Sequence, residues 1–307
     1  MNDLFASNSA SLTTTIAFAL ALTMSLVLKF WLASRQIRHV ARNRGAVPAA
    51  FAEKITLATH QKAADYTITK VRFGLLELAW GAALTIAWTL LGGLSALNQL
   101  LAGVLDNALT QQVALLAAFA TIGGILDLPF TLYQTFVIEE RFGFNKTRLA
   151  LWLQDFAKSL LLSALIGLPF ITLVIWMMGA TGAWWWLWVW GVWMGFNLLA
   201  LLIYPTWIAP MFNKFQPLQD PQVKERVTAL MARCGFTSKG FFVMDGSKRS
   251  AHANAYFTGF GASKRVVFYD TLLAQLSPEE VDAVLAHELG HFTHRHVIKR
   301  MASLFAM

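Results

Sequence analysis

The segment His287-Glu288-Leu289-Gly290-His291 has the residue types and the spacing that a zinc ion requires from one turn of helix. Residues four apart in a helix lie on one face, so His287 and His291 can bind the same ion. Glu288 is then placed to take a proton from a water molecule that attacks a carbonyl carbon. We therefore predict one Zn²⁺ per chain, held by His287 and His291, with Glu288 as the catalytic general base of peptide hydrolysis.

The residues around this motif predict that it lies in a helix. Ser277 has the type of an N-cap residue, Pro278 suits the first helical position, and Glu279 and Glu280 put negative charge in the first turn. Apolar residues then recur at helical spacing at Val281, Val284, Leu285 and Leu289.

Two further histidines follow the motif. His294 lies on the same helical face as His287, but about 10.5 Å further along the axis at 1.5 Å per residue. Three imidazoles on one straight helix converge poorly on a tetrahedral ion. His296 lies off that face. We therefore expect neither residue to be the third ligand, and we interpret this stretch as a solvated basic surface.

The composition is typical of a membrane protein. Hydrophobic residues make up 56% of the chain and charged residues only 14%, and the mean hydropathy is +0.51, outside the usual range of soluble globular proteins. A helix of about 20 apolar residues can cross a bilayer. Five such stretches precede the zinc motif, at 13–32, 73–97, 113–138, 156–178 and 184–208, and a sixth apolar run begins at Met301. We predict an all-α multi-span membrane protein.

Lys and Arg are distributed unevenly between the loops. They occur in 35–72, in 141–148 and after the fifth stretch, but not before the first stretch, in 98–112 or in 179–183. The positive-inside rule then places the N-terminus outside, or in the lumen, and the zinc motif in the cytosol. This orientation fits a protein of a bacterial inner membrane, or of the endoplasmic reticulum membrane of a eukaryote. The same distribution explains the net charge of +8, so we predict contact with the lipid bilayer and no nucleic-acid partner.

The soluble part is predicted to be a small α+β cytosolic cap. Pro221 to Cys234 has helical periodicity with Gly235 as its C-cap, and 241–244 and 265–269 have the composition of strands. The lone Cys234 is predicted to be a small buried residue. The predicted division is a membrane domain at 1–212, the cap at 213–276, and at 277–307 the zinc-motif helix running into a sixth membrane helix.

An extended segment shortly before the zinc helix is the predicted substrate site. Many zinc peptidases bind a peptide as an added β-strand, because backbone pairing accepts many side chains. Asn254, Ala255 and Tyr256, followed by Phe257, form the candidate strand. The alternative is an ordinary hairpin with Gly259 and Gly261 in its turn.

Four blocks of sequence, taken in order, resemble the type I CAAX prenyl endopeptidases. They are Tyr133-Gln-Thr-Phe-Val-Ile-Glu-Glu-Arg-Phe-Gly-Phe-Asn-Lys146, Pro210-Met-Phe-Asn-Lys-Phe215, Asn254-Ala-Tyr-Phe-Thr-Gly-Phe260, and the helix with the HELGH motif. The resemblance implies a helical membrane barrel around an intramembrane chamber, with a zinc site that cleaves peptide bonds on the cytosolic side. It also implies that Asn254 and Ala255 hold the substrate backbone.

The resemblance implies a substrate class as well. Eukaryotic relatives remove the last three residues of prenylated CAAX proteins, and bacterial relatives act in membrane-protein turnover, so the partner is a prenylated or membrane-embedded peptide or protein. The third zinc ligand in this family is a Glu on a later helix. Because the sequence ends at Met307, we expect the chain to be the N-terminal portion of a longer polypeptide that is inactive, or nearly so, by itself.

Three other functions share parts of this pattern. HtpX-like membrane quality-control proteases share the motif but have fewer spans ahead of it. A catalytically silent membrane scaffold or chaperone would be expected to lose Glu288 or a histidine, and all three are present. A channel or transporter would be favoured by internal repeats, which the sequence does not show.

Overall fold

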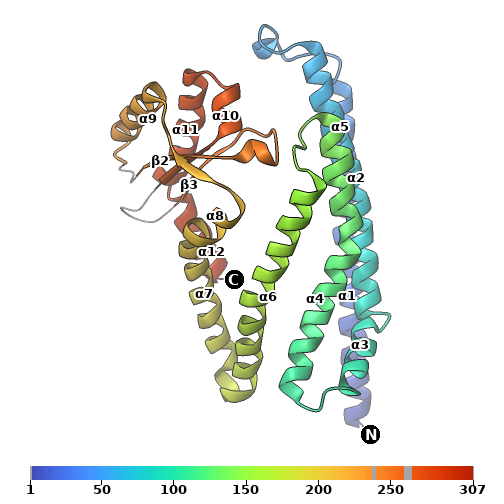
Figure 1. Cartoon of the computed structure of the whole chain (residues 1–307). Helices are drawn as coiled ribbons and strands as arrows, with labels where there is room; N and C mark the ends of the chain where they lie inside the picture. The colour runs from blue at the N-terminus through green and yellow to red at the C-terminus, as the bar shows by residue number, and fades with distance from the viewer. Residues whose placement is uncertain (1, 237–239, 259–264, 307) are drawn as a thin grey trace. The chain divides into compact units, whose positions relative to one another are not determined.

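The structure is a computed structural model that describes residues 2–236, 240–258 and 265–306, with their side chains apart from residues 2–10, 292 and 297 (Figure 1). The chain forms two units, Met1–Phe142 and Gly143–Met307. Gly259 and Gly261, the predicted turn residues, and Met307 lie outside the described residues.

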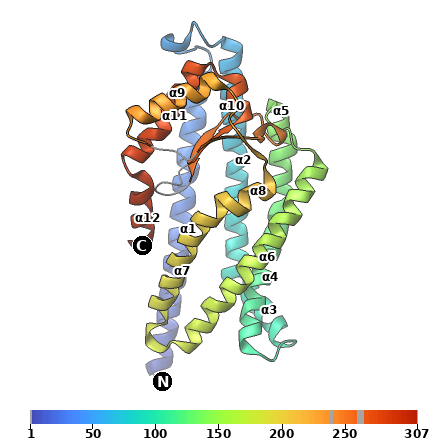
Figure 2. The same ribbon diagram turned by 60° about the vertical axis from the view of Figure 1, so that its left-hand side comes forward.

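The first unit is helical. Its α-helices are α1 (Asn2–Asn43), α2 (Leu57–Thr89), α3 (Gly93–Ala102), α4 (Ala108–Tyr133) and α5 (Glu140–Phe142), with a 3₁₀ turn η1 (Ala49–Phe51) and a π-helical segment η2 (Gln134–Glu139). Helices α1 and α2 lie side by side in both views (Figures 1 and 2). Arg44, just after α1, makes a two-pronged ion pair with Asp65 of α2, with both N–O distances at 2.8 Å. This pair ties the two helices together at one end.

Five helical stretches are long and apolar enough to cross a membrane: Ser11–Asn43, Leu57–Thr89, Ala108–Phe142, Leu149–Ala180 and Gly182–Phe212. They contain 31 to 35 residues each. At 1.5 Å per residue they exceed the roughly 30 Å hydrocarbon core of a bilayer. The prediction of five spans in a multi-span, mostly helical protein is confirmed. The chamber that the family resemblance implies stays a prediction.

The second span has different boundaries from those predicted. The apolar pattern predicted 73–97, but α2 ends at Thr89 and a new helix begins at Gly93. Gly92, between them, has a φ of 80°, in the left-handed region that favours glycine. Hydropathy does not register this break, because the residues on both sides of it are apolar.

The second unit combines two long helices with the cap (Figure 2). The helical elements are α6 (Leu149–Ala180), η3 (Gly182–Trp184), α7 (Trp185–Ile203), η4 (Tyr204–Ile208), α8 (Ala209–Phe212), α9 (Pro221–Arg233), η5 (Gly246–Lys248), α10 (Asp270–Gln275), α11 (Pro278–Thr293) and α12 (His296–Ala306). The strands are β1 (Phe215–Pro217), β2 (Phe241–Met244), β3 (Ala255–Thr258) and β4 (Arg265–Tyr269). The predicted strands at 241–244 and 265–269 are confirmed, whereas β1 was not predicted.

The four strands form one sheet in the order β1-β2-β4-β3. β2 and β4 are parallel, and the two outer pairs are antiparallel. Helices α9 and α11 pack on one face of the sheet, where Val227, Val266, Phe268 and Leu285 are almost completely buried. The predicted small α+β cap is therefore confirmed.

Helix α9 shows how local sequence defines the cap. Asp220 accepts hydrogen bonds from the backbone N–H groups of Gln222 and Val223, at 2.9 and 3.1 Å, which satisfies the helix N-terminus. At the other end Gly235 adopts a φ of 69°, and the N–H of Phe236 donates to the carbonyl of Met231 at 2.9 Å. The predicted role of Gly235 in ending this helix is confirmed.

The expectation that Cys234 is buried is wrong, because the structure exposes it. Cys234 is the residue that follows the last turn of α9. The buried side of that helix instead carries Val223, Val227 and Met231, four residues apart.

Leu285 anchors the zinc-motif helix to the sheet, and its side chain is 0% exposed. Replacing it with Ala should cost about 2–5 kcal/mol, through lost burial and the cavity left behind. Hydrogen exchange of the α11 and β4 amides in the full-length protein would measure this loss. Ile298→Ala in α12, where the side chain is 60% exposed, is the control. Equal protection in Leu285→Ala and wild type would contradict this role.

Candidate metal centre and substrate strand

The zinc-motif helix α11 is fixed at its N-terminus by a capping box. The Ser277 N–H donates to Glu280 Oε2 at 2.9 Å, and the Glu280 N–H donates to Ser277 Oγ at 3.4 Å. One turn further, Arg226 of α9 donates to Asp282 Oδ2 at 2.6 and 3.0 Å and pairs with Glu279 at 3.0 Å. The predicted helix start is confirmed.

The same helix buries its apolar residues and leaves its histidines exposed. Val281, Leu285 and Leu289 recur every four residues and are buried in the core. His287 and His291 are exposed, and Glu288 is half-buried between the two faces. The apolar stripe therefore decides which way the imidazoles point.

The predicted ligands and base are brought together. Each of His287, Glu288 and His291 offers one donor atom, and these atoms all lie within 4.8 Å of one another. The two imidazole rings are nearly perpendicular, with centroids 4.9 Å apart. Two imidazoles beside a carboxylate suit a zinc ion, so the residues present fit this metal. Among the residues that the structure describes, this is the one group of at least three His, Cys, Asp or Glu side chains placed so that it could hold a metal ion.

The stretch after the motif differs from the expectation. Helix α11 ends at Thr293, and Arg295 has a φ of 53° before α12 begins at His296. His296 therefore folds back, and its Nδ1 lies 2.8 Å from Nδ1 of His291. The assumption of one straight helix had placed His296 away from the site. Nothing in the hydrophobic pattern marks this break.

The surroundings of His296 favour its neutral form. Desolvation, and after it the neighbouring His291, His294 and Lys299, lower the pKa of His296. A neutral imidazole can accept a hydrogen bond at Nδ1. His296 can thus orient the ring of His291.

The predicted substrate strand forms the edge of the sheet. β3 (Ala255–Thr258) pairs with β4 on one side, and in the described part of the chain no strand occupies its other side. Asn254, just before it, accepts the N–H of Tyr269 on its carbonyl at 3.0 Å and the N–H of Ala255 on its side chain at 2.9 Å. The antiparallel pairing also agrees with the hairpin alternative, because an arm of a hairpin can still present a free edge.

The side chains of β3 alternate between the two faces of the sheet. Ala255 is 3% exposed and faces the core against α11. Tyr256 and Thr258 point the other way, into a cavity of about 410 Å³ whose lining also includes Phe242, Arg265 and Pro210. Burial, together with the charges of Tyr269 and Tyr204, raises the pKa of Tyr256 to about 12, so this hydroxyl stays neutral at physiological pH.

Two family models match the chain. The model described as "CAAX prenyl protease N-terminal, five membrane helices" matches residues 36–214, more than half of the sequence. The chain belongs to this family. The model "Peptidase family M48" matches residues 217–307, which include most of the cap and the zinc-motif helix. The resemblance predicted from the four blocks is confirmed.

Individual relatives agree with the family assignment. "CAAX prenyl protease 1 homolog" of Oryza sativa subsp. japonica is 43% identical over 194 residues, which are 63% of this chain and 46% of that protein. "CAAX prenyl protease 1" of Saccharomyces cerevisiae is 35% identical over 283 residues, 87% of this chain and 61% of that protein. The chain thus spans about half to three fifths of the length of these relatives.

A solved structure shares the fold. The crystal structure of S. mikatae Ste24p superposes with a TM-score of 0.86 at 30% sequence identity. The match covers 93% of this chain and 68% of that one. The similarity therefore extends over both the membrane helices and the cap.

Proposed function

We propose that the full-length protein is an integral-membrane zinc metalloendopeptidase that cleaves peptide bonds on the cytosolic side of the membrane. The observation that carries this proposal is the convergence of His287, Glu288 and His291 on α11, a helix that packs against β3. A channel would need neither of these features. A scaffold would not need a preserved base beside two ligands.

Each residue has a defined task in the proposed reaction. His287 and His291 would hold the zinc ion, and His296 would fix the orientation of His291. When bound, zinc lowers the pKa of an attacking water and polarises the scissile carbonyl. The Glu288 carboxylate accepts the proton of that water and later donates it to the leaving amine nitrogen. The family resemblance leads us to expect a Glu as the third ligand.

The substrate would bind as an additional strand along β3. The backbone groups of 255–258 on the edge away from β4 would pair with the peptide, which explains how different sequences can be accepted. Alternate side chains of the peptide would face the cavity beside Tyr256 and Thr258. Because the relatives are named CAAX prenyl proteases, we propose C-terminal CAAX peptides, prenylated in eukaryotic relatives, as the substrate class.

A cleavage assay tests this function. The full-length protein in lipid vesicles is incubated with one CAAX peptide in farnesylated and unmodified form, and the products are identified by mass spectrometry. Release of the C-terminal tripeptide is expected. Cleavage of membrane peptides only at internal sites would favour a quality-control protease of the HtpX type. No cleavage of any peptide would contradict the enzymatic proposal and favour a scaffold.

The proposed orientation can be tested with Cys234, the single cysteine of this chain, which is exposed at the end of α9. A membrane-impermeant maleimide should label it in inside-out vesicles and not in right-side-out vesicles, since the cap is proposed to be cytosolic. Any further cysteines of the full-length protein are first replaced by Ser. Cys234→Ser is the control for specific labelling. Labelling in right-side-out vesicles only would show that the cap lies outside, which is the reverse of the proposed topology.

A further inference from the structure

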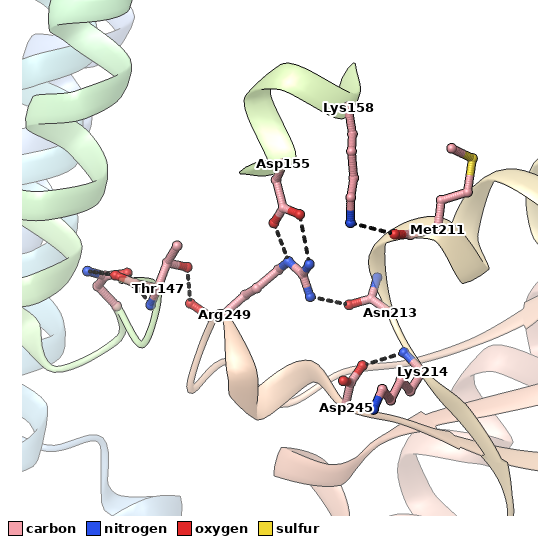
Figure 3. Close-up of polar contacts among 9 residues, drawn as sticks. Thr147, Asp155, Lys158, Met211, Asn213, Lys214, Asp245 and Arg249 are labelled. Atoms are coloured by element: carbon pink, nitrogen blue, oxygen red, sulfur yellow. Dashed lines mark hydrogen bonds and ion pairs between the residues drawn. The ribbon is translucent and has the colours of Figure 1, made fainter. Parts of the chain in front are cut away.

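Arg249 lies in the connection between β2 and β3, six residues before the start of β3 at Ala255. It is drawn at the centre of Figure 3, where three parts of the second unit meet: the beginning of α6, the end of α8 and this connection. None of the sequence motifs singles it out. Its contacts have no part in the zinc chemistry described above.

The guanidinium of Arg249 makes a two-pronged ion pair with Asp155 of α6. Nε donates to Oδ2 at 2.8 Å and Nη2 donates to Oδ1 at 3.0 Å (Figure 3). Both side chains are only about one fifth exposed. The remaining Nη1 donates to Asn213 Oδ1 at 2.9 Å, just after α8. Such planar, paired contacts specify orientation as well as attraction.

The backbone of the same connection is bound to the loop that leads into α6. The carbonyl of Arg249 accepts the N–H of Lys146 at 3.1 Å and the hydroxyl of Thr147 at 3.0 Å. Two residues on, the N–H of Ala251 donates to the carbonyl of Phe144 at 2.9 Å. Residues 249–251 and 144–147 are therefore joined almost as two short strands.

The opposite side of the connection is bound to α10. The hydroxyl of Thr271 donates to the carbonyl of His252 at 2.9 Å, and the side chain of Gln275 donates to the carbonyl of Ala251 at 3.0 Å. The connection is thus held on both sides until β3 begins at Ala255. A displacement of Arg249 would be transmitted to β3 through only a few residues.

We infer that Arg249 is a positioning residue for substrate binding, whose pair with Asp155 couples the membrane helix α6 to the edge strand β3. The inference rests on the proposed function only for the role of β3; the coupling itself rests on the contacts above. The zinc-motif helix shares its apolar core with β3, but it is held in addition by Arg226 of α9, which does not contact the connection around Arg249. Loss of Arg249 should therefore disturb the strand and leave the metal site intact.

The experiment compares Arg249→Gln, Arg249→Lys and Asp155→Asn with wild type in the full-length protein. Four quantities are measured: hydrogen exchange of the β3 amides relative to those of α11, zinc content, and both KM and kcat for one peptide. In Arg249→Gln we expect about tenfold faster β3 exchange and about tenfold higher KM, with zinc content and kcat within about twofold of wild type. The β3 exchange rate and the KM of Arg249→Lys should lie between those of wild type and Arg249→Gln, because an ammonium group keeps the charge but lacks the planar fork of a guanidinium.

Two controls separate positioning from general stability. Arg44→Gln breaks another two-pronged Arg–Asp pair, in the first unit and about 40–45% exposed, and should change none of the four quantities. The exchanged pair Arg249→Asp with Asp155→Arg should recover part of the β3 protection. If Arg249→Gln does not fold, Arg249→Lys and Asp155→Asn decide in its place.

Unchanged β3 exchange in the Arg249 and Asp155 variants would overturn the inference. So would equal loss of protection in β3 and α11 together with loss of zinc, which would indicate a purely structural pair. If the wild-type protein cleaves no peptide, the proposed function fails, but the exchange measurement still decides the coupling. The two failures are therefore distinguishable.

Discussion

Glu288→Gln should lower kcat of the full-length protein by roughly 10²- to 10⁴-fold, the usual contribution of a general base, while zinc stays bound. Gln has nearly the shape of Glu, but its amide cannot accept the proton of the attacking water. The proposed ligands are the histidines on either side, His287 and His291, so the metal should be retained. Initial cleavage rates and zinc content measured on the same preparation check both parts.

Glu280→Gln is the matched control for this variant. Glu280 lies on the same helix, and its side chain caps the N-terminus, a role that Gln can also perform. Its rate should stay close to that of wild type. Undiminished cleavage by Glu288→Gln at equal zinc content would show that another residue is the base.

His287→Ala should lose both the metal and the activity. Mutating a residue that only hydrogen-bonds to a metal ligand typically lowers metal affinity by about 10- to 100-fold. Removing a direct ligand should lower the affinity at least as much. Zinc per chain after dialysis is the measurement, with cleavage falling to background. His39→Ala is the control, because it makes the same His-to-Ala change in α1, outside the proposed site. A full complement of zinc in His287→Ala would contradict the ligand assignment.

Much of the fold could be predicted because its signals are local. The HELGH motif, the Ser277 cap and the spacing of Val281, Leu285 and Leu289 all act within one helix, so one sequence contains them. The five spans follow from hydropathy in the same way. The helix of the second span ends before the predicted boundary, because a glycine with positive φ breaks a stretch whose composition is uniformly apolar.

The remaining features depend on contacts between distant residues. Arg249 and Asp155 are 94 positions apart, and neither belongs to a pattern. The place of His296 beside His291 depends on a backbone turn at Arg295. The edge position of β3 depends on the strand order, which no single segment encodes. These features required the structure.

The most direct test of the account is removal and return of the metal. The full-length protein in detergent is treated with a zinc chelator, dialysed, and assayed for cleavage of a CAAX peptide before and after one equivalent of Zn²⁺ is added. We predict that cleavage disappears with the metal and returns with it, in wild type but not in His287→Ala. Cleavage that persists in protein shown to be free of zinc would contradict the central claim.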